Sequence, residues 1–121
     1  MPPPENAIPE ETLAECVEAV PGFASFWASE GDSWYVDEDG SFASCGVFML
    51  LCEYIKEDPE RMSDGHWRAL GRVARVYFDR DEACRGMIGA CLIEGVQFQP
   101  FSAKVQRHFD PEVLRHFSFD R

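Results

Sequence analysis

The chain has 121 residues, a length typical of one domain. Apolar residues make up 45% of it and aromatic residues 13%, which is enough to fill one core and excludes a disordered chain. The 22 acidic side chains outnumber the 11 basic ones, so the formal net charge is −11 and the pI is about 4.5. Because this charge repels phosphate backbones and anionic membranes, we expect neither nucleic acid nor a membrane as partner.

The charge is also unevenly distributed. Residues 1–60 hold 14 acidic side chains and one basic side chain, Lys56, which gives 1 − 14 = −13. Residues 61–121 hold 8 acidic and 10 basic side chains, which gives 10 − 8 = +2. Such asymmetry often marks an interaction surface, although acidic helix faces can simply keep a small protein soluble.

The N-terminal segment, residues 1–8, is rich in proline, and we expect it to be flexible. It has neither the basic region nor the apolar region of a signal peptide. Pro9 then opens a helix whose apolar residues recur at i, i+3, i+4 and i+7 up to Val20. Pro21-Gly22 ends it, and a second, short helical face carries Phe23, Phe26 and Trp27 and ends near Gly31.

Residues 32–40 form a turn-rich loop in which Gly40 supplies the turn. Ser41 is the expected N-cap of a third helix that runs to about Glu57. Its middle, residues 45–52, is apolar on nearly every side, which predicts a central buried helix. At eight residues this longest apolar run is too short to cross a bilayer, which takes about 20.

Four further helical segments follow. Ser63 or Asp64 caps a helix over residues 64–79, and an apolar stripe runs over 84–95, where Gly86 and Gly89 would let a neighbour approach closely. Short helices are predicted after Pro100 and after the Asp110-Pro-Glu cap. The prediction is a single all-α domain, residues 1–121, of five to seven helices. Helix 42–56 lies at its centre, with 64–79 and 84–95 packed on it.

The five cysteines are an odd number without an export signal, which favours reduced thiols in a cytoplasmic protein. Cys45/Cys52 and Cys84/Cys91 are each seven residues apart, so each pair shares one helix face. No Cys-x-x-Cys spacing and no metal-ligand spacing to a histidine occurs. We therefore expect all five, Cys16 included, to fill the core with no disulfide and no metal.

The patterns of common active sites are missing from the sequence. With Gly40 at position 6 of an EF-hand loop, Tyr35 and Gly46 fall where the first and last carboxylates belong, so calcium is not expected. There is no nucleophile elbow and no Gly-rich phosphate loop. Cys91 lies on an apolar stripe that disfavours a thiolate. We therefore expect no enzymatic activity and no cofactor.

Three short segments carry a resemblance. They are Trp34-Tyr35, then Asp39-Gly-Ser-Phe42 before an apolar helix, and Ala90-Cys-Leu-Ile-Glu-Gly95. Over roughly residues 25–117 the chain resembles a small acidic bacterial domain of unknown function, whose members are similar to immunity proteins encoded beside secreted toxins. The chain departs from the late family segment C-F-L-E-N, because it has Leu92-Ile-Glu-Gly there. The resemblance implies a toxin-neutralising role and supplies no catalytic residue.

The leading hypothesis is therefore an immunity-type inhibitor that binds a toxin with a basic surface. Its expected contacts lie in the acidic loop, where aromatic anchors would join charged residues: Glu30, Asp32, Trp34, Tyr35, Asp37, Glu38 and Asp39. The alternative is a non-catalytic helical adaptor or regulatory domain, with mimicry of nucleic acid as a variant of inhibition. The Arg68, Arg72 and Arg75 face is the second candidate surface, although such arginines usually face solvent or pair with acids of the same chain.

Overall fold

A computed structural model describes residues 7–118 of the chain, without the side chains of residues 31–34. The predicted flexibility of residues 1–8 therefore falls almost wholly outside the described residues. In chain order the elements are α1 (Pro9–Ala19), α2 (Phe23–Trp34), α3 (Ser44–Glu57), the 3₁₀ turn η1 (Pro59–Arg61), α4 (Asp64–Arg80), α5 (Glu82–Ile88), the π-helical segment η2 (Gly89–Ile93), α6 (Glu94–Val96), α7 (Ser102–His108) and α8 (Pro111–His116).

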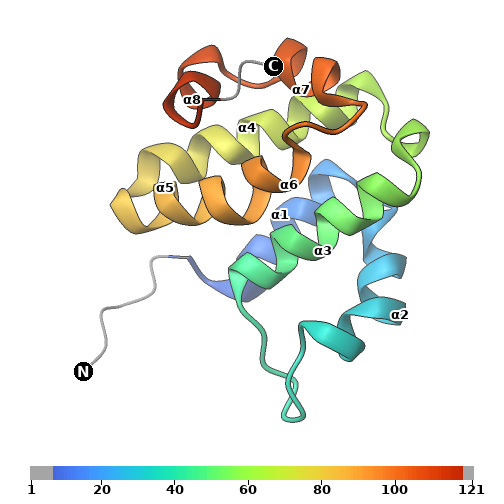
Figure 1. The fold of residues 1–121 in the computed structure, drawn as a ribbon. Coiled ribbons are helices and arrows are strands. Elements are labelled where there is room, and N and C mark those ends of the chain that lie inside the picture. Colours follow the sequence, from blue (N-terminus) through green and yellow to red (C-terminus); the bar gives the residue numbers. More distant parts are fainter. Residues whose placement is uncertain (1–6, 119–121) are drawn as a thin grey trace.

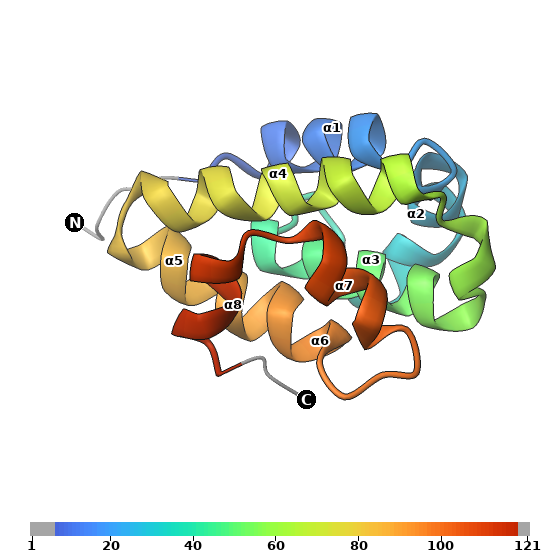
Figure 2. The ribbon, with the colours of Figure 1, turned by 90° about the horizontal axis from the view of Figure 1, so that it is seen from above.

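The all-α prediction is confirmed. Segments α5, η2 and α6 follow one another without a break, so residues 7–118 contain seven helices and no strand. Only an isolated bridge between Val36 and Phe42 has extended pairing. Helix α4 lies beside α1, α5 and α7, and α3 lies beside α1, α2 and η2, as Figures 1 and 2 show from two directions.

Helix α3 is the buried centre that its composition predicts. Eight of its fourteen residues are buried, among them Val47, Phe48, Leu51 and Ile55, each fully removed from solvent. Segment η2 packs on α3 as expected. Helix α4 packs mainly on α1, α5 and α7, and it reaches α3 through the ring of Tyr77, whose centroid lies 5.4 Å from that of Phe48.

Local sequence signals set most helix starts. Ser63 accepts a hydrogen bond from the backbone N–H of His66, and the His66 ring accepts one from the Ser63 N–H, which makes a reciprocal cap. Asp110 caps α8 ahead of Pro111, as predicted. Ser41 is not the N-cap of α3, because that helix begins at Ser44 after Ala43.

The prediction of five reduced cysteines is wrong. A disulfide joins Cys45 of α3 to Cys91 of η2, one member from each of the two sequence pairs. The seven-residue spacing places cysteines on one face of their own helix, but only the packing of α3 against η2 decides which sulfur atoms meet across the seam. The other three cysteines are buried and free, as core filling predicts: Cys16, Cys52 and Cys84.

Candidate protein-binding face

The acidic loop is a short hairpin closed by the bridge between Val36 and Phe42. The Asp37 N–H donates to the Ser41 carbonyl at 2.8 Å, and the Gly40 N–H donates to the Asp37 carbonyl at 2.9 Å. Gly40 has φ of +88°, a conformation that glycine adopts without strain. The prediction that Gly40 supplies the turn is confirmed.

Ser41 holds the tip of this loop in place. Its hydroxyl donates to a carboxylate oxygen of Asp39 at 2.6 Å and lies 3.2 Å from one of Asp37, and its N–H donates to Asp39 at 3.0 Å. These hydrogen bonds hold the pKa of Asp39 below its usual value, so the carboxylate stays charged. The serine expected to cap α3 instead fixes the shape of the loop, because its hydroxyl and its N–H are hydrogen-bonded to the carboxylates of Asp37 and Asp39.

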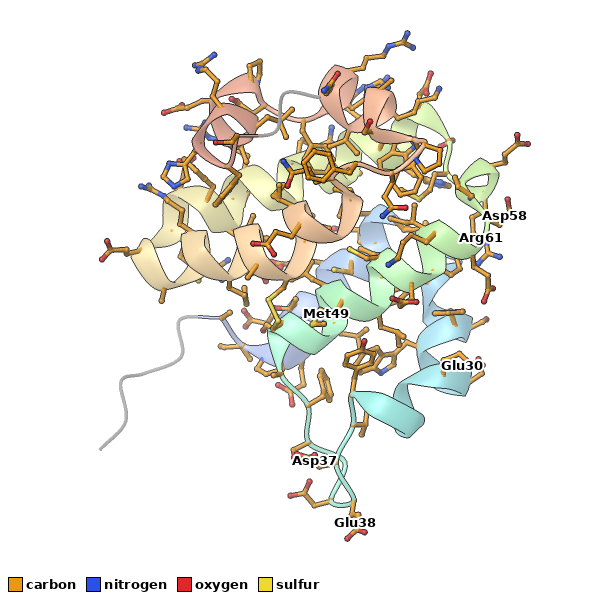
Figure 3. All side chains as sticks on the ribbon, viewed as in Figure 1. Glu30, Asp37, Glu38, Met49, Asp58 and Arg61 are labelled. Carbon is orange, nitrogen blue, oxygen red and sulfur yellow. A yellow bond between two sulfur atoms is a disulfide. The ribbon has the colours of Figure 1, made fainter. Side chains whose placement is uncertain are left out.

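The predicted site residues lie on two neighbouring elements. Glu30 is exposed near the end of α2, and Asp37, Glu38 and Asp39 are exposed on the hairpin. In Figure 3 Asp37 and Glu38 project from the body of the molecule at the tip of the loop. Asp32 and Trp34 belong to α2, which extends three residues past the expected end at Gly31, and their side chains lie outside the described part of the chain.

Tyr35 joins the loop to the body. It is half-buried and packs on Gly46 of α3, where a Cβ atom would lie 3.3 Å from the tyrosine ring. One part of its side chain therefore supports the loop, and another part lines the groove described next.

A groove of about 530 Å³ lies between α2 and α3, beside the loop. Sequence reasoning missed its α3 wall, although an exposed edge at i, i+3 and i+4 was a usable signal: Glu53, Lys56 and Glu57. The groove has apolar and aromatic surface between carboxylates, and its lining is Phe26, Glu30, Tyr35, Leu50, Glu53, Lys56 and Glu57. We call this groove and the exposed loop residues 37–39 the acidic face.

Part of this negative charge is already neutralised within the chain. Lys56 lies 3.3 Å from Glu53, and Arg61 lies 3.5 Å from Glu57. The side-chain carboxylates of Glu30 and Glu38 have no hydrogen bond or ion pair with another described residue. The acidic face is therefore most negative at its α2 rim and at the loop tip, and least negative along α3.

The second candidate surface, which carries Arg68, Arg72 and Arg75, is partly paired with acidic residues of the same chain. Arg75 donates to Asp79 and to Glu112, each at 2.8 Å, and lies 3.4 Å from Asp110. These partners raise the pKa of Arg75, and its guanidinium group is already paired with carboxylates of the same chain. The expectation of an internal role is confirmed for Arg75, whereas Arg68 and Arg72 are exposed.

The described residues offer little for covalent or metal chemistry. Burial raises the pKa of the Cys52 thiol to about 12 and also raises the pKa of Cys16 and of Cys84, so these thiols are neutral at pH 7 and poor nucleophiles. Residues 7–118 contain no group of three or more histidine, cysteine, aspartate or glutamate side chains placed to hold a metal ion. None of the helices described is long and apolar enough to cross a membrane.

Comparison with known proteins adds no relative: no family model, no curated protein and no solved structure matches the chain.

Proposed function

We propose that this protein is an immunity-type inhibitor that binds one protein partner with a basic surface, such as a secreted toxin domain. The observation that carries the proposal is the acidic face, in which a groove with aromatic walls continues into an acidic loop held by internal hydrogen bonds. Exposed carboxylates steer a basic partner and speed its association. A preformed groove then gives an apolar side chain, or the stem of a lysine or arginine, a place to pack.

Within this proposal the residues have distinct tasks. Glu30, Asp37, Glu38 and Asp39 supply charge at exposed positions, and Tyr35 supplies a semi-rigid aromatic wall. Trp34 and Asp32 keep the anchor and charge roles that their residue types favour. The proposed protein uses no cofactor and catalyses no reaction, since recognition alone would neutralise the partner.

The alternative function is an adaptor or regulatory domain that uses the same face. The first discriminating observation is the neighbouring gene, because immunity proteins are encoded beside their toxins. A secreted toxin gene there identifies the partner to test, and a regulator or metabolic operon favours the adaptor.

The first experiment measures association and dissociation rates with the neighbouring gene's toxin domain at two salt concentrations. Reversal of Asp37, Glu38 and Asp39 to lysine changes the net charge from −11 to −5, and it also breaks the hydrogen bonds to Ser41. The sharper variant is Asp37→Asn, Glu38→Gln, Asp39→Asn, which removes three charges but keeps the acceptors. It should slow association and reduce the salt dependence without lowering the melting temperature.

The matched control is the pair Arg68→Glu and Arg72→Glu, which changes exposed charges on the other candidate surface. It should leave association no slower than in the unaltered protein. Trp34→Ala should act mainly on dissociation, because an anchor contributes after docking. The acidic face is not the recognition surface if the neutralised loop binds as fast, and with the same salt dependence, as the unaltered protein.

The cytoplasmic location expected from the thiols stays a prediction, and the disulfide argues against it. Disulfides persist in oxidising compartments and are rare in the cytosol. Trapping of thiols in intact cells, followed by mass analysis, decides the question. Five alkylated cysteines would support the cytoplasm, and three would support an oxidising compartment.

A further inference from the structure

A second groove, of about 400 Å³, lies between α1 and α4 and shares no residue with the acidic face. The two helices run side by side, as Figure 2 shows from above. They are antiparallel, since Thr12 of α1 hydrogen-bonds Tyr77 of α4 while Ala19 and Ala69 line the other end of the groove.

Helix α4 carries apolar residues beyond its fully buried inner face. Its inner face is buried through Trp67, Leu70, Ala74, Tyr77 and Phe78. A second apolar stripe at i, i+4 and i+7 lines the groove: Ala69, Val73 and Val76. Ala69 and Val73 are half-buried and also pack against the core, whereas Val76 does not. The side chain of Val76 is 51% exposed, one of the few large apolar side chains among the described residues to be so. This stripe of small and β-branched residues would let another helix pack closely.

The charges on the two walls of the groove are opposite. The α1 wall carries Glu15 and Glu18, and α1 contains no basic residue. The α4 wall carries Arg72, with Arg68 one turn away. A partner of one charge sign would be attracted by one wall and repelled by the other. A second copy of the chain, related to the first by a twofold axis along the groove, solves this problem. Its arginine wall lies opposite the glutamate wall of the first copy, and its glutamate wall lies opposite the arginine wall.

We propose that this groove is a twofold interface that binds a second copy of the chain. The α4 stripe of each copy packs against the groove of the other around Val76, and Arg72 of each copy faces Glu18 of its partner. A net charge of −11 opposes self-association elsewhere on the surface, so the local charge pattern sets the register. We expect the dimer to be weak, with Kd of about 1–100 µM, because the like net charge of the two copies opposes their association.

The test is sedimentation equilibrium of the full chain from about 1 µM to about 1 mM, a range that spans this Kd. The average mass should rise from that of the monomer toward twice that value. Val76→Lys should raise Kd by about tenfold or more, since it places a charge in the apolar centre of the interface. Because Val76 is exposed, this change should not lower the melting temperature of the monomer by much.

A charge swap tests the twofold register directly. Glu18→Arg and Arg72→Glu should each weaken the homodimer, because each variant places like charges against each other at both rims. An equimolar mixture of the two variants should restore association, because every rim contact in the mixed dimer pairs opposite charges. A monomer at all concentrations would overturn the proposal. So would a dimer that none of these changes affects, or a mixture that stays as weak as its components.

Discussion

Thr12 and Ser44 are the two polar side chains buried in the core of residues 7–118. The Thr12 hydroxyl lies 2.8 Å from that of Ser44 and 2.7 Å from that of Tyr77, and Tyr77 also donates to Glu15 at 2.5 Å. Burial and the bond to Glu15 raise the pKa of Tyr77 to about 12, so it acts as a neutral donor. This cluster joins α1, α3 and α4 at one point, where directional hydrogen bonds fix their relative positions.

Replacing Thr12 with valine tests how much this cluster contributes to the free energy of unfolding. Thr12→Val keeps the shape of the side chain but removes the hydroxyl that two buried partners use, which should lower the free energy of unfolding by about 1–3 kcal/mol. Thr12→Ser is the control, because it keeps the hydroxyl and removes only a methyl group. Urea denaturation compares the two. If valine is no more destabilising than serine, the cluster fills space and adds no net hydrogen-bond stability.

A second effect at the scale of residues is the loss of stability at low pH that Asp64 should cause. Asp64 accepts a hydrogen bond from Lys104 at 2.9 Å, and Nε2 of the mostly buried His108 lies 3.5 Å away. The bond to Lys104 lowers the pKa of Asp64 from its ordinary value of 3.8. Since the unfolded chain then takes up the proton first, the stability from this carboxylate is present above about pH 4 and lost as the pH falls through its folded pKa.

Lys104→Met removes the main partner of Asp64 and tests this assignment. The unaltered protein should be more stable than the variant at pH 7, and the difference should shrink toward zero as the pH falls below the folded pKa of Asp64. Urea midpoints measured at several pH values give that difference. A gap that stays constant with pH would mean that Lys104 contributes through packing and not through its bond to Asp64.

At the scale of elements, Gly71 of α4 is tightly packed, whereas Gly86 of α5 faces open space. A Cβ atom at Gly71 of α4 would lie 2.6 Å from the His108 carbonyl oxygen and 3.2 Å from the Cα atom of Phe109. The absence of a side chain there lets α4 and the end of α7 approach closely. A Cβ atom at Gly86 would meet nothing within 4 Å, so the sequence-based expectation of a close approach is wrong at Gly86. It holds at Gly89, which faces the ring of Phe117.

Two alanine substitutions should therefore change stability in opposite directions. Gly71→Ala meets backbone atoms that cannot move aside, and should cost about 1–3 kcal/mol. Gly86→Ala fits into open space on α5 and should stabilise by about 0.5–1 kcal/mol through helix propensity. Thermal melts of both variants are the measurement. Destabilisation by both would show that the two sites are equally packed, contrary to the geometry described.

The helices themselves could be predicted because their signals are local. Ser63, Asp110 and Pro9 mark helix starts within one turn of the residues they serve, and the apolar run in α3 reports burial directly. Ser41 shows the limit of this approach. Its capping potential is real, but the side chains of Asp37 and Asp39 compete for the same hydroxyl, and a one-dimensional pattern does not reveal which partner is nearer.

At the scale of the whole molecule, the candidate site could be predicted only in part. The loop residues Asp37, Glu38 and Asp39 stand out in the sequence as an exposed acidic run. The groove beside them depends on how α2 packs on α3, and it includes Leu50, which is 3% exposed and looks like any core residue. A feature formed by two segments that are far apart in the sequence can be predicted only when the packing of those segments is known. The disulfide between Cys45 and Cys91 is the clearest example, since 46 residues separate the two cysteines.

This crosslink should contribute to the stability of the whole chain. Closing a loop of that length restricts the unfolded chain, and the usual gain is about 2–4 kcal/mol. Cys45→Ala with Cys91→Ala should lower the urea midpoint accordingly. A reducing agent should destabilise the unaltered protein to a similar extent and leave the double variant unchanged. Cys84→Ala is the control, because a lone buried thiol forms no crosslink and its loss should not alter the response to reductant. Equal stability of oxidised and reduced protein would show that packing between α3 and η2 holds this seam without the bond.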